Sequence, residues 1–172
     1  MTCVEGAVRE RAQRVRLLCL DVDGVLTDAG MYYGPDGEVL KKFNTRDGMG
    51  LARVREAGVA VALISGEDSA IVHARAAKLK IDDVFCGVSD KAIAVDQLCA
   101  KHRIVLEDVA FVGDDLNDLP ALAQVGLACA VADAAEQVLA VAHYVTRRRG
   151  GDGAVREVCE LLIAARKRPG GD

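Results

Sequence analysis

Short apolar runs alternate along the chain with segments whose apolar residues recur at the helical period. Six runs have the length and aliphatic character of buried strands: residues 16–22, 59–64, 83–85, 109–112, 126–130 and 143–145. Helical periodicity predicts helices over residues 47–57, 68–80, 89–102, 116–124, 134–140 and 153–167. Asp47, Asp68 and Ser89 stand where N-terminal caps are expected. The alternation predicts a three-layer, Rossmann-like α/β fold around a mostly parallel sheet.

One segment interrupts this alternation, at about residues 30–43. Two short strand-like runs flank Gly34-Pro35-Asp36-Gly37, a sequence typical of a tight turn. We therefore expect a β-hairpin inserted after the first strand, with Met31, Tyr32 and Tyr33 exposed on it. The rest is expected to form one domain over residues 1–172, with a flexible tail at about 168–172.

Composition narrows the possible classes of protein. Hydrophobic residues make up 51% of the 172 and aromatic residues 3%, which predicts one domain with an aliphatic core. The charge balance of 22 Lys+Arg against 26 Asp+Glu argues against a nucleic-acid partner. Six scattered cysteines without a Cys-x-x-Cys pair indicate neither a zinc site nor a disulfide framework. Because no signal peptide or long apolar run appears, we expect a cytoplasmic protein with no membrane partner.

Two acidic groups follow two of the predicted strands. Asp21 and Asp23 end the first strand, and Asp114, Asp115 and Asp118 follow the strand at 109–112. Carboxyl ends of parallel strands share one edge of the sheet, where ligands bind. Carboxylates gathered there repel one another unless a cation lies between them, and oxygen ligands suit Mg²⁺. Either group alone could also be a solvated turn or an acidic helix start.

Two further polar groups lie at strand ends or helix starts. Ser65 and Gly66 offer a hydroxyl and backbone N–H groups that can hold phosphate oxygens, although the signal is weak alone. Lys91 falls in the first turn of a predicted helix, where the helix dipole disfavours a cation, so a charged partner is expected. A solvated surface lysine is the ordinary alternative.

In chain order these features resemble the motifs of the haloacid dehalogenase superfamily of phosphohydrolases. The motifs are Asp21-x-Asp23-Gly24-x-x-Thr27, then Ser65, Lys91 and Gly113-Asp114-Asp115-x-x-Asp118. The resemblance covers nearly the whole chain. It implies a Mg²⁺-dependent phosphomonoesterase with the superfamily's α/β fold, in which the hairpin takes the place of a cap domain.

The resemblance also implies roles for these residues. Asp21 would attack phosphorus to form an aspartyl-phosphate, and Asp23 would act as general acid and then as general base. Ser65 and Gly66 would hold the phosphoryl group. Lys91 would balance the charge of nucleophile and phosphate.

The same resemblance implies the metal ligands. The Asp21 carboxylate, the Asp23 backbone carbonyl and Asp114 would bind Mg²⁺. Asp115 and Asp118 would act through water or from outside the direct ligands.

Within the superfamily, the chain resembles the capless, tetrameric phosphatases of 3-deoxy-ulosonate sugar phosphates. Three segments carry this resemblance: FNTRDGMG, VGDDLND and GGDGAVREV. Arg46 lies in the first of them. Glu67, Arg75 and Lys78 resemble the subset that acts on nine-carbon substrates, 2-keto-3-deoxynononate or N-acylneuraminate 9-phosphate, and slightly favour them over 3-deoxy-D-manno-octulosonate 8-phosphate. These charges, with Arg46, are the expected substrate-binding residues, although an ordinary charged helix face explains Arg75 and Lys78 equally well.

The expected partners are a small anionic sugar phosphate and further copies of the chain, in a tetramer joined through the hairpins. Residues 147–156 of a neighbouring subunit are candidates for sugar recognition. Two other classes stay open: a receiver-like signalling domain, which also combines carboxylates, Mg²⁺ and a lysine, and a noncatalytic assembly module related to sugar cytidylyltransferases.

Overall fold

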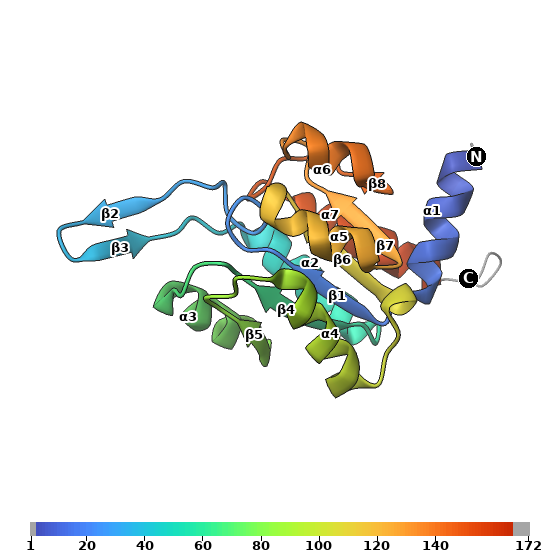
Figure 1. Ribbon diagram of the computed structural model, residues 1–172, viewed down its shortest axis with the longest axis horizontal. Helices are drawn as coiled ribbons and strands as arrows, with labels where there is room; N and C mark the ends of the chain where they lie inside the picture. The colour runs from blue at the N-terminus through green and yellow to red at the C-terminus, as the bar shows by residue number, and fades with distance from the viewer. Residues whose placement is uncertain (1–2, 167–172) are drawn as a thin grey trace.

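A six-stranded parallel sheet forms the centre of the molecule (Figure 1). The computed structural model describes residues 3–166, with side chains from residue 6 onward. The strand order is β5-β4-β1-β6-β7-β8. The strands are β1 (Leu17–Leu20), β4 (Ala60–Ile64), β5 (Asp83–Phe85), β6 (Val109–Gly113), β7 (Leu127–Ala130) and β8 (Tyr144–Val145). All six lie within or one residue beyond the runs predicted from the sequence, so the predicted α/β fold is confirmed.

Helices cover both faces of this sheet. They are α1 (Cys3–Arg14), α2 (Thr45–Glu56), α3 (Ala70–Leu79), α4 (Lys91–His102), α5 (Leu119–Gln124), α6 (Glu136–Val141) and α7 (Ala154–Arg166), with short 3₁₀ turns at Leu106–Asp108 and Leu116–Asp118. Helices α1 and α2 pack against α7 on one side, and α4 packs against α5 on the other (Figure 1). Among the described residues, no helix is long and apolar enough to cross a bilayer.

The central strands read as continuous apolar runs because both of their faces are covered. Every residue of β1, β6 and β7 is buried. Phe111 is the only aromatic side chain among the largest fully buried side chains of the described core, which is otherwise built mainly from Leu, Val, Ile and Ala. The composition predicted an aliphatic core, and the fold confirms it.

Helix α1 was not predicted from the sequence. Its segment, CVEGAVRERAQR, is mostly polar, and only Val8 and Ala12 contribute to the core among its side chains described from residue 6 onward. It packs on α7. The segment predicted as one helix over 116–124 is instead a 3₁₀ turn followed by α5, which carries a proline in its first turn.

The three predicted helix caps were wrong. The observed N-caps are Asn44, Ser69 and Asp90. Asp90 accepts the Ala92 N–H at 2.9 Å, one residue beyond the predicted cap Ser89, and Ser69 likewise follows the predicted cap Asp68.

Asp47 lies inside α2 and has a different partner. Its buried carboxylate accepts N–H groups of Gly153 at 3.2 Å and Arg156 at 2.7 Å. It therefore caps α7, on a segment distant in sequence.

The predicted hairpin is present and projects away from the sheet (Figure 1). Strands β2 (Tyr32–Gly34) and β3 (Gly37–Leu40) pair antiparallel across the predicted turn. Met31, Tyr32 and Tyr33 are 47%, 48% and 63% exposed, as expected from the sequence.

Candidate active site

The carboxyl ends of three adjacent strands bring the predicted polar residues to one edge. Strand β1 pairs in parallel with β4 on one side and β6 on the other. Asp21 follows β1, Ser65 follows β4 and Asp114 follows β6. The adjacency of these strands is what places residues nearly a hundred positions apart side by side.

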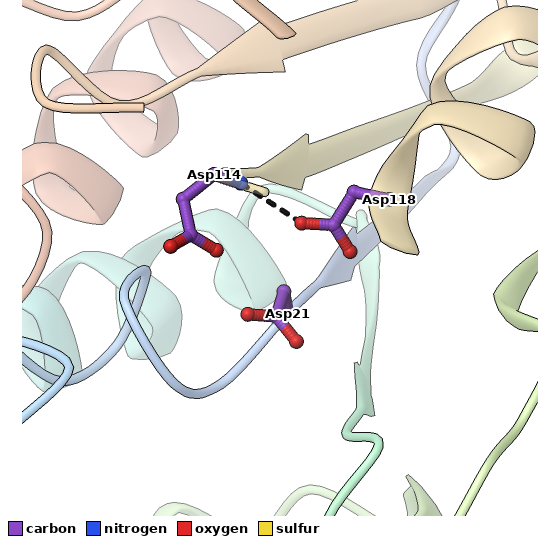
Figure 2. Close-up of side chains that lie close together, drawn as sticks. All are labelled: Asp21, Asp114 and Asp118. Carbon is purple, nitrogen blue, oxygen red and sulfur yellow. Dashed lines mark hydrogen bonds between the residues drawn. The ribbon is translucent and has the colours of Figure 1, made fainter. Parts of the chain in front are cut away.

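Three carboxylates converge at this edge (Figure 2). Asp21, Asp114 and Asp118 each offer an oxygen, and these oxygens lie within 4.8 Å of one another. Gly24 makes the approach possible, because a Cβ at that position would overlap the Asp114 carboxylate. Its φ of +96° also belongs to the region that glycine occupies without strain.

Burial and mutual repulsion change the acidity of this cluster. Burial, followed by the charge of Asp118, raises the pKa of Asp21 to about 6. Burial, followed by the charges of Asp21 and Asp118, raises the pKa of Asp114 to about 8. A site whose carboxylates resist ionisation in this way favours a bound cation.

Lys91 has the charged partners that the sequence led us to expect. Its side chain is 2% exposed, and its Nζ lies 2.5 Å from Asp21 Oδ1 and 2.6 Å from Asp118 Oδ1. Burial alone would lower the pKa of Lys91, but attraction to the two carboxylates outweighs burial and raises it. The lysine therefore stays an ammonium ion beneath the acidic cluster.

Asp118 shapes the loop that carries Asp114. Its Oδ2 accepts the N–H group of Asp114 at 2.8 Å (Figure 2). The same oxygen accepts the Asp115 N–H at 3.3 Å, while Oδ1 accepts from the Lys91 ammonium. Asp115 is exposed and accepts the Leu116 N–H at 2.7 Å as a helix cap. Donors therefore engage both Asp118 oxygens, so Asp118 positions the Asp114 loop and Lys91.

A cavity of about 230 Å³ opens above these groups. Its lining residues are Asp21, Asp23, Ala29, Met31, Gly66, Glu67, Asp114, Asp115 and Asn117. Ser65 is buried beside it, and its Oγ accepts the Glu67 N–H at 3.1 Å, which orients the hydroxyl. The cavity therefore combines carboxylates with the Ser65-Gly66 turn, as a phosphate site with a metal ion requires.

Asp23 has a partner that was not predicted from the sequence. The Lys41 Nζ lies 2.6 Å from Asp23 Oδ1 and 2.6 Å from Glu38 Oε1. The Ser69 hydroxyl donates to Glu38 Oε2 at 2.6 Å. Lys41 looks in the sequence like half of a solvated Lys-Lys pair, so no pattern signalled its burial.

The expected substrate-binding residues do not gather at this cavity within one chain. Glu67 lines it, but the Arg75 guanidinium lies over the Phe43 ring, with Cζ 5.3 Å from the ring centroid. Lys78 lines a separate cavity of about 470 Å³. Arg46 is exposed.

The segment after β8 closes over the loop that follows Asp21. Gly151 donates its N–H to the Val25 carbonyl at 3.0 Å. A Cβ at Gly150 would overlap the Gly24 carbonyl. The glycine-rich segment at 147–153 is thus a loop that packs directly on this edge of the sheet.

The donor set fits magnesium. The available ligands are carboxylate oxygens, which Mg²⁺ prefers. Burial and then mutual repulsion raise the pKa of Asp21 and of Asp114, and a cation between them would relieve that repulsion. Asp21 and Asp114 would hold the ion through their carboxylates.

Comparison with known proteins agrees with this chemistry. Residues 79–158 match the family of haloacid dehalogenase-like hydrolases. The fold, the acidic strand edge and this match define a hydrolase of that superfamily, whose phosphatases use Mg²⁺. A receiver-like domain is thereby ruled out.

The most similar relatives narrow the class further. The chain is 48% identical over 162 residues to 3-deoxy-D-manno-octulosonate 8-phosphate phosphatase KdsC of Yersinia pestis, covering 94% of this chain and 87% of the relative. The crystal structure of the Yersinia pestis phosphatase superposes with a TM-score of 0.91 at 48% identity, covering 93% and 86% of the two chains. That of the Moraxella catarrhalis phosphatase, in complex with magnesium, phosphate and KDO, gives 0.89 at 40% identity, covering 92% and 91%. The chain belongs to this family of phosphoric monoester hydrolases.

Proposed function

We propose that this enzyme removes the phosphate of 3-deoxy-D-manno-octulosonate 8-phosphate through an aspartyl-phosphate on Asp21. The observation that carries the proposal is the convergence of Asp21, Asp114 and Lys91 beside the 230 Å³ cavity. The relatives named above supply the substrate.

The nine-carbon substrates that the sequence slightly favoured have no support in these relatives. The names of these relatives refer to the eight-carbon sugar. The charged residues behind the nine-carbon expectation are also dispersed. Only Glu67 lines the cavity, while Arg75 and Lys78 lie over Phe43 and at another cavity. The eight-carbon substrate is therefore the better proposal.

The proposed chemistry has two steps. Asp21 attacks phosphorus while the bond from phosphorus to the sugar oxygen breaks, and Asp23 gives that oxygen its proton. Water then attacks the aspartyl-phosphate, Asp23 takes back a proton, and phosphate leaves. Ser65 and Gly66 hold the phosphoryl oxygens, and Lys91 keeps Asp21 oriented. Bound Mg²⁺ supplies charge neutralisation for phosphoryl transfer.

Assembly of several chains is part of the proposal. Met31, Tyr32 and Tyr33 expose apolar surface on a hairpin that no other described part of the chain covers. We expect four copies to bury it, which light scattering tests; a fully active monomer would contradict the expectation.

The decisive experiment is a phosphatase assay on octulosonate 8-phosphate, 2-keto-3-deoxynononate 9-phosphate and N-acetylneuraminate 9-phosphate, with and without Mg²⁺. We expect Mg²⁺-dependent turnover that is fastest on the eight-carbon compound. Asp21→Asn should abolish it. Asp28→Asn is the matched control, because Asp28 pairs with the exposed Lys42 instead. Turnover by Asp21→Asn, or faster hydrolysis of a nine-carbon compound, would refute the corresponding part of the proposal.

A further inference from the structure

Lys41 is a buried ammonium group at the base of the hairpin. Its side chain is 0% exposed, whereas that of the adjacent Lys42 is 61% exposed. A lysine is almost never fully buried unless it is paired. Here burial alone would lower the pKa of Lys41, but the hydrogen bonds that its ammonium donates to Asp23 and Glu38 outweigh burial and raise it.

The partners of Lys41 connect three separate segments. Glu38 lies on β3, and its second carboxylate oxygen accepts the Ser69 hydroxyl at the start of α3. Asp23 lies on the loop after β1. Glu38, which Ser69 holds in turn, also binds the Lys41 ammonium, so the position of the ammonium does not depend on Asp23 alone.

The contact with Lys41 leaves the two carboxylate oxygens of Asp23 in different surroundings. Oδ1 accepts the Lys41 ammonium at 2.6 Å. Oδ2 is buried and has no hydrogen-bond partner among the described residues, and Asp23 lines the cavity beside Asp21. An unpartnered buried carboxylate oxygen at the mouth of a reaction cavity is available to a group that enters it.

We propose that Lys41 is a positioning residue that holds Asp23 with Oδ2 toward the leaving oxygen of the substrate. The inference rests on the proposed function. As the bond between phosphorus and the sugar oxygen breaks, the proton on Asp23 Oδ2 passes to that oxygen, and it is regained from water in the second step. Lys41 donates to Oδ1 throughout and keeps its own protons.

A purely structural role for Lys41 makes a different prediction from a positioning role. If Lys41 only ties the hairpin to the body, its loss weakens hydrolysis of every phosphate ester alike. If Lys41 orients Asp23 as the general acid, its loss slows hydrolysis mainly of esters whose leaving oxygen needs a proton. An alkyl phosphate needs that proton, whereas p-nitrophenolate leaves without it.

The experiment compares kcat/KM of Lys41→Met on 3-deoxy-D-manno-octulosonate 8-phosphate and on p-nitrophenyl phosphate. This parameter reports steps up to phosphoryl transfer onto Asp21, so the hydrolysis step shared by both substrates does not mask the difference. General acid catalysis contributes about 10²–10⁴-fold, and we expect the octulosonate value to fall about 10–100-fold more than the aryl value.

Matched variants complete the design. Lys42→Met removes the adjacent, exposed lysine and should change neither value. Lys41→Arg keeps a positive donor and should restore part of the ratio. Should Lys41→Met fail to fold, Glu38→Gln loosens the same ammonium from its other anchor and should shift the ratio in the same direction by a smaller factor.

The outcomes separate the two proposals. Equal losses on both substrates for Lys41→Met, or an unchanged ratio for Glu38→Gln where Lys41→Met does not fold, overturn the positioning role alone. A wild-type protein that hydrolyses neither ester overturns the proposed function, and the positioning role with it.

Discussion

Replacing Lys91 by methionine tests the electrostatics of the acidic edge most directly. The substitution keeps an unbranched side chain but removes the ammonium that lies 2.5 Å from Asp21 and 2.6 Å from Asp118. Breaking a buried pair by removing one partner costs about 3–5 kcal/mol. For a chain of this size about 1 kcal/mol corresponds to about 2–4 °C in the unfolding midpoint, so we expect a fall of about 6–20 °C.

The assay is thermal unfolding without metal at pH 8 and at pH 5. Repulsion between the orphaned carboxylates is relieved by protonation, and the pKa of Asp21 is already raised to about 6 with Lys91 present. The loss of stability should therefore be smaller at pH 5 than at pH 8. Added Mg²⁺ should restore part of the midpoint at pH 8, because it returns positive charge to the cluster.

The control is Lys101→Met. Lys101 lies at the same 2.5 Å distance from a carboxylate, that of Asp83, but its side chain is 59% exposed. The lysine end of this pair is exposed, and Asp83 keeps His102 Nε2 as a second partner at 2.6 Å. We therefore expect a cost of about 1 kcal/mol or less, and a fall in the midpoint of no more than about 4 °C. Equal shifts for the two variants at pH 8 would show that burial of Lys91 is not what makes its charge important.

Three further outcomes are expected. The pKa values of about 6 for Asp21 and about 8 for Asp114 lie above the ordinary 3.8, so the metal-free protein should lose thermal stability as pH rises from about 4 to about 8. Calorimetry should show that Mg²⁺ binds more tightly as pH rises from about 6 to about 8 and that binding releases protons. Mg²⁺ binding that does not depend on pH would contradict this expectation. Gly24→Ala should abolish Mg²⁺-dependent activity by displacing the Asp114 carboxylate, whereas Gly37→Ala, at φ +115° in open space, should keep it. Asp47→Ala removes the cap of α7 and should cost about 1–2 kcal/mol in urea unfolding; an unchanged midpoint would argue against the cap.

Much of the fold was predictable because its strands are buried on both faces. Such strands appear as uninterrupted apolar runs, and the run at residues 83–85 matches β5 without a shift. Helix α1 escaped prediction because its segment is mostly polar, and it is held by packing on α7 rather than by its own periodicity. The caps were misplaced because neighbouring residues near a helix start, such as Ser89 and Asp90, both have side chains suited to a cap.

Some residues of the candidate site were predictable from the sequence and others were not. Asp21, Ser65 and Asp114 were predictable because each directly follows a parallel strand, and such strands end at one edge. Lys41 and Asp47 were not. The burial of Lys41 depends on the hairpin, and the partner of Asp47 is a helix more than a hundred residues further along the chain.

The packing of Gly150 and Gly151 on the loop after Asp21 has a consequence for biosynthesis. Asp21 is translated well before Gly150 and Gly151, so its loop leaves the ribosome before the backbone that closes over it. At about 5–20 residues per second, several seconds separate the two events. A nascent or truncated chain that lacks Gly150 and Gly151 therefore carries Asp21 beside a loop that this backbone does not yet cover, so we expect Mg²⁺-dependent phosphatase activity only from chains that extend beyond these glycines.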